Sequence, residues 1–167
     1  MYKYDLTSKL LHWISVILIF TMICLGFTAS FTDNYSVIWF HKSFGITLLI
    51  IMTFRLIWRF TKMHKPDYEV KIALPKLVFA KFIHFMLYAS VFTMLLSGWL
   101  SSSFAHYPVP FWGLNVSLPV PLIKSVSHFL WDVHTTTIYV LITCIILHMI
   151  GTTYHFINKD KILERML

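Results

Sequence analysis

The most constraining feature of this sequence is a set of four long apolar stretches separated by polar or basic segments. The stretches lie at residues 10–29, 38–60, 80–101 and 129–156. Crossing the hydrocarbon core takes about 20 residues of helix, and lipid offers backbone N–H and C=O groups no hydrogen-bond partners. Each stretch is therefore predicted to be a transmembrane helix. The sequence predicts an all-α fold, in which residues 1–167 form a single transmembrane domain, an integral four-helix bundle.

The composition favours a membrane protein over a soluble one. Hydrophobic residues make up 57% of the 167 residues and charged residues 13%, against about 25% charged residues in a typical soluble domain. One water-soluble core of this size could not bury so much apolar surface, and a disordered chain would carry far less of it. Both cysteines, Cys24 and Cys144, lie inside apolar stretches, so no disulfide framework is expected.

Basic residues are concentrated on one side of the predicted membrane. Twelve of the fourteen Lys and Arg residues lie at the inner ends of the stretches or between the second and third: Lys3, Lys9, Arg55, Arg59, Lys62, Lys65, Lys71, Lys76, Lys81, Lys159, Lys161 and Arg165. Only Lys42 and Lys124 lie on the other side. By the positive-inside rule, both termini and the segment 59–81 are predicted to be cytoplasmic. The net charge of +7 is thus a topology signal, and no nucleic-acid partner is expected.

The outer connection between the third and fourth stretches is long and unusual in composition. Residues 102–128 hold four of the six prolines, and they also include apolar pairs such as Phe111-Trp112. A segment of this kind is expected either to lie on the outer membrane surface or to fold over the bundle as a lid.

Four of the nine histidines fall at matched depths in the predicted bundle. His12 lies near the inner face and His41 near the outer face, whereas the last stretch holds His134 near the outer face and His148 near the inner one. The 14 residues between His134 and His148 correspond to about 21 Å along a helix and a rotation of only about 40°. These two side chains therefore share one helix face at two depths.

Pairing by depth joins His41 with His134 and His12 with His148. Two imidazoles that face each other across a bundle are ligands that haem iron takes. The pattern therefore predicts two haems b stacked across the bilayer, which would form an electron path between its faces. Ionisable residues inside membrane spans are costly, and this supports a functional role for them.

Three other interpretations of the histidines stay open to test. A single intramembrane histidine can be a hydrogen-bonded core residue, and a proton relay is conceivable although the span interiors lack carboxylates. Zinc is disfavoured because its ligands converge on one point. Gly45 and Gly151, which follow His41 and His148 by four and three residues, would leave room beside a porphyrin, although both also suit close helix packing.

Three further polar residues lie at the inner level of the bundle. Arg55 follows His41 by 14 residues, and Arg59 lies one turn further on the same face. One or both are hypothesised to bind haem propionates, with snorkelling to the headgroups as the alternative. His84 has no depth partner, so it is a candidate to hydrogen-bond a quinone or a propionate, or a packing residue.

An ordered set of motifs runs along nearly the whole chain. They are Leu-His-Trp at 11–13, Phe-His-Lys-Ser-Phe-Gly at 40–45, Arg-Leu-Ile-Trp-Arg at 55–59, His134 and His148 with His155 seven residues later, and Lys-Asp-Lys-Ile-Leu at 159–163. The set resembles the bacterial cytochrome b561 family. The resemblance implies a multi-pass protein of the bacterial inner membrane that binds two haems b. By position, their axial ligands are His12, His41, His134 and His148.

The resemblance also implies a function. Family members pass electrons between quinone and a partner at the outer face, and some oxidise superoxide there. The chain is therefore expected to be an oxidoreductase that uses ubiquinone or menaquinone, with superoxide as the candidate outer substrate and Lys42 and Lys124 as a positive patch that would attract it. The alternatives are a cytochrome b subunit of a dehydrogenase or hydrogenase complex, and a non-redox transporter whose histidines relay protons. A homodimer stays open, and no catalytic residue is assigned.

Overall fold

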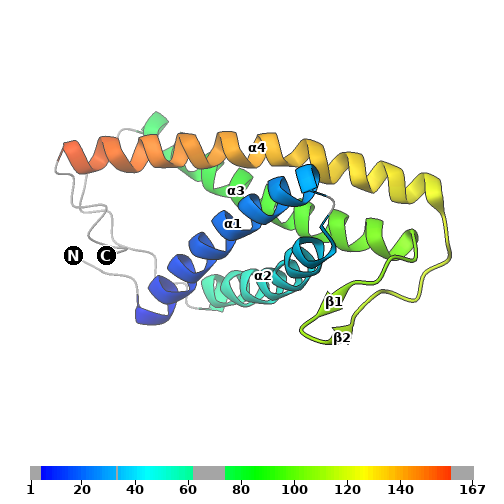
Figure 1. The fold of residues 1–167 in the computed structure, drawn as a ribbon. Coiled ribbons are helices and arrows are strands. Elements are labelled where there is room, and N and C mark those ends of the chain that lie inside the picture. The colour runs from blue at the N-terminus through cyan, green and yellow to red at the C-terminus, as the bar shows by residue number, and fades with distance from the viewer. Residues whose placement is uncertain (1–4, 33, 62–73, 159–167) are drawn as a thin grey trace.

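Four long helices make up most of the computed structural model, which describes residues 5–32, 34–61 and 74–158 (Figure 1). Each helix encloses one predicted stretch and extends beyond it at both ends: α1 Leu6–Thr32, α2 Tyr35–Thr61, α3 Leu74–Phe104 and α4 Lys124–Ile157. All four are long and apolar enough to cross a membrane. The prediction of four membrane helices is confirmed. The basic segment 62–73 lies outside the described residues.

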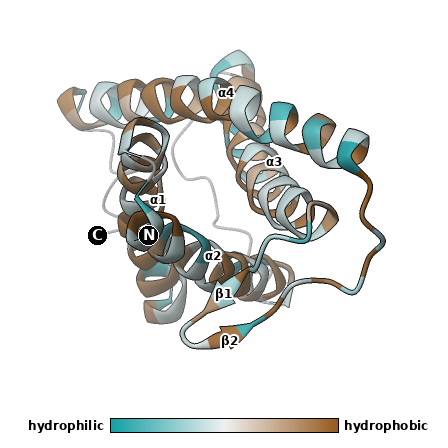
Figure 2. Cartoon of the chain, turned by 45° about the vertical axis from the view of Figure 1, so that its right-hand side comes forward, coloured by the Kyte–Doolittle hydropathy of each residue, from teal (hydrophilic) through white to brown (hydrophobic). Residues whose placement is uncertain are grey.

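The helices form two hairpins that meet in the middle of the bundle. α1 packs along α2 and α3 along α4, and the hairpins meet through α2 and α3. The core at this junction consists of Leu48, Met52, Val91 and Leu141. Hydrophobic residues recur along all four helices (Figure 2), and many of the large ones are exposed, as expected of helices that face lipid.

Among the residues that the structure describes, the buried polar side chains all belong to serines. Seven serines are buried: Ser15, Ser43, Ser90, Ser97, Ser101, Ser103 and Ser127. Their small side chains let helices approach closely, and their hydroxyls find carbonyl acceptors. Ser101 of α3 and Ser127 of α4 donate to each other's backbone carbonyls at 3.0 and 2.9 Å. This reciprocal contact joins the ends of α3 and α4 that the outer connection links.

The outer connection contains a small β-hairpin, which the sequence did not predict. β1 (Pro110–Phe111) pairs with β2 (Leu114–Asn115) in antiparallel register. The two residues between them, Trp112 and Gly113, have positive φ angles of 49° and 99°, as a tight two-residue hairpin turn requires. Tryptophan is an uncommon residue at such a position, so the sequence carried no turn signal there.

The hairpin folds back onto the helix ends rather than standing apart from them. Ser43 of α2 donates to the carbonyl of Pro110 at 3.1 Å, and Nε1 of Trp112 donates to Oγ1 of Thr47 at 3.0 Å. The ring of Trp112 also contacts Trp39 and Phe44. The hairpin therefore packs against α2. The two expectations for this segment, a position on the outer membrane surface or a lid over the bundle, stay predictions.

Candidate functional site

The structure brings together the two histidines predicted to lie near the outer face. His41 of α2 and His134 of α4 have ring centroids 6.2 Å apart, and their ring planes are nearly perpendicular at 86°. Both residues are half-buried. Residues 93 positions apart in sequence therefore form one pair of imidazoles between α2 and α4. The β-hairpin lies near the same end of the bundle, beside α2 (Figure 1).

The two rings differ in the hydrogen bonding of their Nδ1 atoms. Nδ1 of His134 lies 2.8 Å from the carbonyl oxygen of Met94 on α3. Because a carbonyl only accepts, Nδ1 carries the proton and Nε2 keeps a free lone pair. The buried Nδ1 of His41 makes no hydrogen bond of good geometry in the described part of the chain, although the backbone of Met22 lies close.

Two glycines seat these rings, one in each helical hairpin. A Cβ atom on Gly26 of α1 would lie 3.2 Å from Cε1 of His41, and one on Gly98 of α3 would lie 2.9 Å from Cε1 and Nδ1 of His134. Each ring thus packs directly against the backbone of the neighbouring helix. At Gly98 the space is too small for any side chain.

Sequence reasoning selected other glycines. A Cβ atom on Gly45 would meet the methyl group of Met22 at 3.4 Å, which indicates helix packing, and one on Gly151 would meet nothing within 4 Å. The predicted depth of each residue in the membrane could have identified Gly26 and Gly98. Both lie near the outer ends of their stretches, at the level of His41 and His134.

The opposite end of the bundle, which the sequence predicts to be the inner end, is organised differently. Nη2 of Arg55 lies 2.8 Å from Nδ1 of His12. A guanidinium has only donors, so Nδ1 accepts this hydrogen bond and the proton of a neutral His12 lies on Nε2. Arg55 therefore lies at the level of His12, as its spacing from His41 predicted.

Three histidines gather at this inner end. The ring of His148 lies 5.0 Å from that of His84, at an angle of 83°, and His12 is close enough to both for electrostatic interaction. Nδ1 of His84, which is exposed, contacts the carbonyl of Ala80 at 2.6 Å. Among the ring contacts within the described residues, His148 pairs with His84 and not with His12.

Arg59 joins this group through an aromatic ring. The Cζ atoms of Arg55 and Arg59 each lie 5.4 Å from the ring centroid of Tyr88 on α3. Neither arginine forms an ion pair with a carboxylate within residues 5–32, 34–61 and 74–158. The cluster of His12, Arg55, Arg59, His84, Tyr88 and His148, which we call the inner cluster, draws on all four helices.

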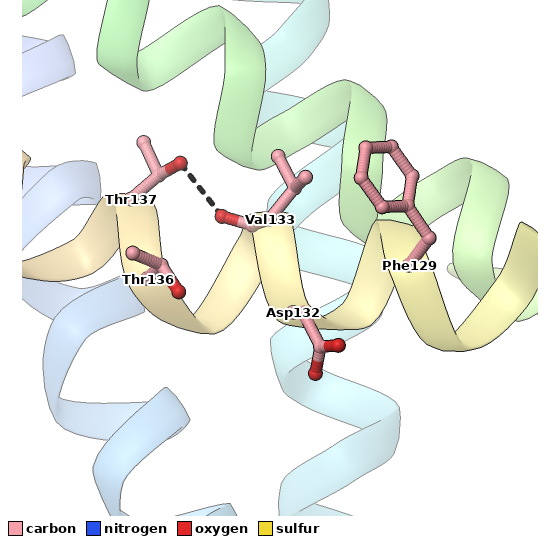
Figure 3. A pocket seen from close by; sticks show the side chains of 5 residues that line it. All are labelled: Phe129, Asp132, Val133, Thr136 and Thr137. Atoms are coloured by element: carbon pink, nitrogen blue, oxygen red, sulfur yellow. Dashed lines mark hydrogen bonds between the residues drawn. The ribbon is translucent and has the colours of Figure 1, made fainter.

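Two further observations limit the chemistry of the site. Within the described part of the chain, no three or more His, Cys, Asp or Glu side chains converge as a metal site would require. A surface hollow of about 310 Å³ is lined by Phe129, Asp132, Val133, Thr136 and Thr137 (Figure 3). All five belong to α4, so the hollow does not join the histidines of different helices.

Comparison with known proteins identifies the family of this four-helix protein. The family model described as prokaryotic cytochrome b561 matches residues 3–167. The chain belongs to the prokaryotic cytochrome b561 family. It is also similar to the Escherichia coli (strain K12) protein named cytochrome b561 homolog 2, with 27% identity over 179 residues that cover 99% of this chain and 91% of that protein. Membership in the cytochrome b561 family makes the chain a membrane b-type cytochrome, and it implies haem b binding and electron transfer.

The outer histidine pair fits the cofactor that the family implies. A metal–imidazole bond is about 2 Å long, and a ring nitrogen lies about 1 Å from its ring centroid. Two imidazoles on opposite sides of one iron atom therefore have centroids about 6 Å apart. The observed 6.2 Å agrees, and His134 donates its other ring N–H to a carbonyl, as metal-bound histidines generally do.

Proposed function

We propose that this cytochrome b561 family member is a multi-pass protein of the bacterial inner membrane that binds two haems b and carries electrons across the bilayer. Quinone is its proposed partner at the inner end, and superoxide is its proposed substrate at the outer end. The observation that carries the proposal is that two separate groups of histidines lie at opposite ends of one bundle. One group is His41 and His134, and the other is His12, His84 and His148.

The proposed ligands are His41 and His134 at the outer end and His12 and His148 at the inner end. Because Nδ1 of His12 accepts a hydrogen bond from Arg55, a neutral His12 would bind iron through Nε2 only after its proton moved to Nδ1 and Arg55 gave up this hydrogen bond. When bound, haem iron supplies one-electron redox chemistry. His134 is held in its tautomer by Met94. Arg55 and Arg59 present guanidinium groups that lack carboxylate partners among the described residues, and this supports their proposed role in binding the carboxylates of inner-haem propionates.

The quinone partner is supported by the position of His84. This residue is exposed on α3 at the inner level, and its ring lies 5.0 Å from that of His148. Because Nδ1 contacts the carbonyl of Ala80, Nε2 of neutral His84 is free to accept a proton from a quinol. After protonation, the same nitrogen can donate to a quinone carbonyl.

The superoxide substrate is supported by two cations at the outer end. Nζ of Lys42 donates to the carbonyl of Pro108 at 2.9 Å, which holds a half-buried positive charge beside His41. Lys124 is exposed at the first residue of α4. Together they would favour the approach of a small anion.

The proposal is tested first by the haem content. We expect two haems b per chain by pyridine haemochrome and a reduced-minus-oxidised spectrum of a b-type cytochrome. A haem-free chain would overturn the proposal in favour of the non-redox transporter. Stable co-purification with a dehydrogenase would favour the alternative in which the chain is a subunit of such a complex.

The outer substrate has a separate test. In the double variant Lys42→Glu and Lys124→Glu, the rate of haem reduction by superoxide should fall, with the largest deficit at low ionic strength. Haem reduction by quinol is the control and should keep its wild-type rate. An unchanged superoxide rate at low ionic strength would exclude electrostatic attraction by these lysines.

A further inference from the structure

Tyr88 occupies the space between two like charges. Its ring centroid lies 5.4 Å from Cζ of Arg55 and 5.4 Å from Cζ of Arg59. Both distances are within the range of about 6 Å over which a cation is attracted to an aromatic face. Two guanidiniums one helical turn apart repel each other, so one ring on α3 gathers two charges of α2 that would otherwise separate.

The ring of Tyr88 is itself fixed in place. Tyr88 is half-buried and packs against the core of Leu48, Met52, Val91 and Leu141. Arginines near the inner end of a membrane helix would otherwise extend toward the lipid headgroups and water. The packed ring therefore offers the arginines a stationary position inside the bundle.

Arg55 also links the Tyr88 ring to α1. The same guanidinium that contacts Tyr88 donates to Nδ1 of His12 at 2.8 Å. Contacts thus run from Tyr88 on α3 to Arg55 on α2 and on to His12 on α1, while Arg59 adds a second charge beside the same ring.

We propose that Tyr88 is a positioning residue for the inner haem: its ring holds Arg55 and Arg59 at the level of that haem. This inference rests on the proposed function. Nearby positive charge favours the reduced state of a redox centre, because reduction adds negative charge there. Loss of the ring should let the arginines move toward the headgroups, so the potential of the inner haem should fall.

The test is a redox titration of the full chain in detergent with variants at one position. Tyr88→Leu removes the ring, Tyr88→Met removes it but keeps a longer flexible side chain, and Tyr88→Phe keeps the ring without the hydroxyl. We expect a shift of the inner-haem midpoint potential to more negative values in the Leu and Met variants and a wild-type value in the Phe variant. The outer haem serves as an internal reference and should not shift.

Two controls separate positioning from a general loss of packing. Tyr139 on α4 is 69% exposed, so Tyr139→Leu removes an outward-facing ring and should leave both potentials unchanged. In a chain that already carries Arg55→Leu and Arg59→Leu, adding Tyr88→Leu should cause no further shift, because the groups that the ring holds are gone.

Several outcomes would overturn the inference about Tyr88 and leave the proposed function standing. They are an unchanged inner potential in both Tyr88→Leu and Tyr88→Met, an equal shift in Tyr88→Phe, or a full further shift in the background without the arginines. Failure of both ring-less variants to accumulate in the membrane, while Arg55→Leu accumulates, would assign Tyr88 to folding instead. A wild-type chain without haem would overturn the proposed function, and the wild-type spectrum recorded first distinguishes that case.

Discussion

The two ends of the bundle hold their histidines by different means. At the outer end, His41 and His134 lie against the backbone at Gly26 and Gly98, and Met94 supplies a carbonyl acceptor. At the inner end, the long side chain of Arg55 holds His12. The outer arrangement is built from backbone, which moves only when helices move, whereas the inner arrangement depends on charged side chains with many rotatable bonds.

This difference indicates that the two ends respond to different changes. Added volume should disturb the outer pair, because a helix backbone cannot withdraw from an added methyl group as a flexible side chain can. Altered charge should disturb the inner cluster, where Arg55 interacts with His12 and Arg59 lies beside the same tyrosine ring as Arg55. Variants at each end of the bundle test this contrast.

The largest effect is expected from removing a proposed ligand. His41→Ala and His134→Ala should each remove the outer haem and halve the haem content, while His12→Ala and His148→Ala should remove the inner one. Haem per chain by pyridine haemochrome measures the loss. His84→Ala is the control for the inner group and should keep both haems. Normal haem content in any one of the four variants would reject that residue as a ligand.

The second largest effect on haem content is expected from adding a methyl group at Gly98. Its Cβ would lie 2.9 Å from two atoms of the His134 ring, and overpacking typically costs about 1–3 kcal/mol. Gly98→Ala should therefore lower outer-haem occupancy, and Gly26→Ala should do so less, since its closest contact is 3.2 Å. Gly151→Ala, which meets nothing within 4 Å, is the matched control. Equal haem content in all three variants would show that these glycines do not seat the rings.

Removal of one guanidinium should shift a potential without removing a haem. Arg55→Leu takes away the positive charge next to His12, so the inner haem should become harder to reduce while the outer haem keeps its potential. A redox titration followed in the optical spectrum distinguishes the two. An inner potential and occupancy equal to those of the wild type would argue that Arg55 only extends to the headgroups.

The smallest effect is expected at Asp5, just before α1. Its carboxylate accepts hydrogen bonds from Ser8 at 2.5 Å and from Nε1 of Trp58 at 3.1 Å, which ties α1 to α2. In Asp5→Ala the free energy of unfolding should fall by about 1 kcal/mol or less. The effect is small because these contacts are exposed.

The Asp5 effect should also depend on pH. The hydrogen bond from Ser8 lowers the pKa of this carboxyl below its ordinary value of 3.8. A carboxyl that ionises more readily in the folded state stabilises that state above pH 3.8, and the contribution is lost as the pH falls through its lowered pKa. The difference in unfolding temperature between wild type and Asp5→Ala should therefore shrink below that pH. A constant difference would contradict this assignment.

The sequence by itself determined the membrane setting, the number of helices and the depths of the histidines. These follow from length, hydropathy and the fixed rise per residue of a helix, which is why the 14-residue spacing of His134 and His148 was informative. The spacing of Arg55 from His41 likewise located it near His12. The sequence left two arrangements of the outer connection open and did not predict its β-hairpin, because proline and apolar content do not specify a hairpin turn.

Only the tertiary structure decided which side chains meet. The seating of His134 on Gly98, the hydrogen bond of Arg55 to His12, and the choice of His84 as the ring beside His148 depend on how α1, α2, α3 and α4 rotate and cross. A helical period gives the face of one helix, but it does not give the neighbour that the face meets. Contacts between residues far apart in sequence arise from packing, and for this reason Gly26, Gly98 and Tyr88 became visible only in the folded chain.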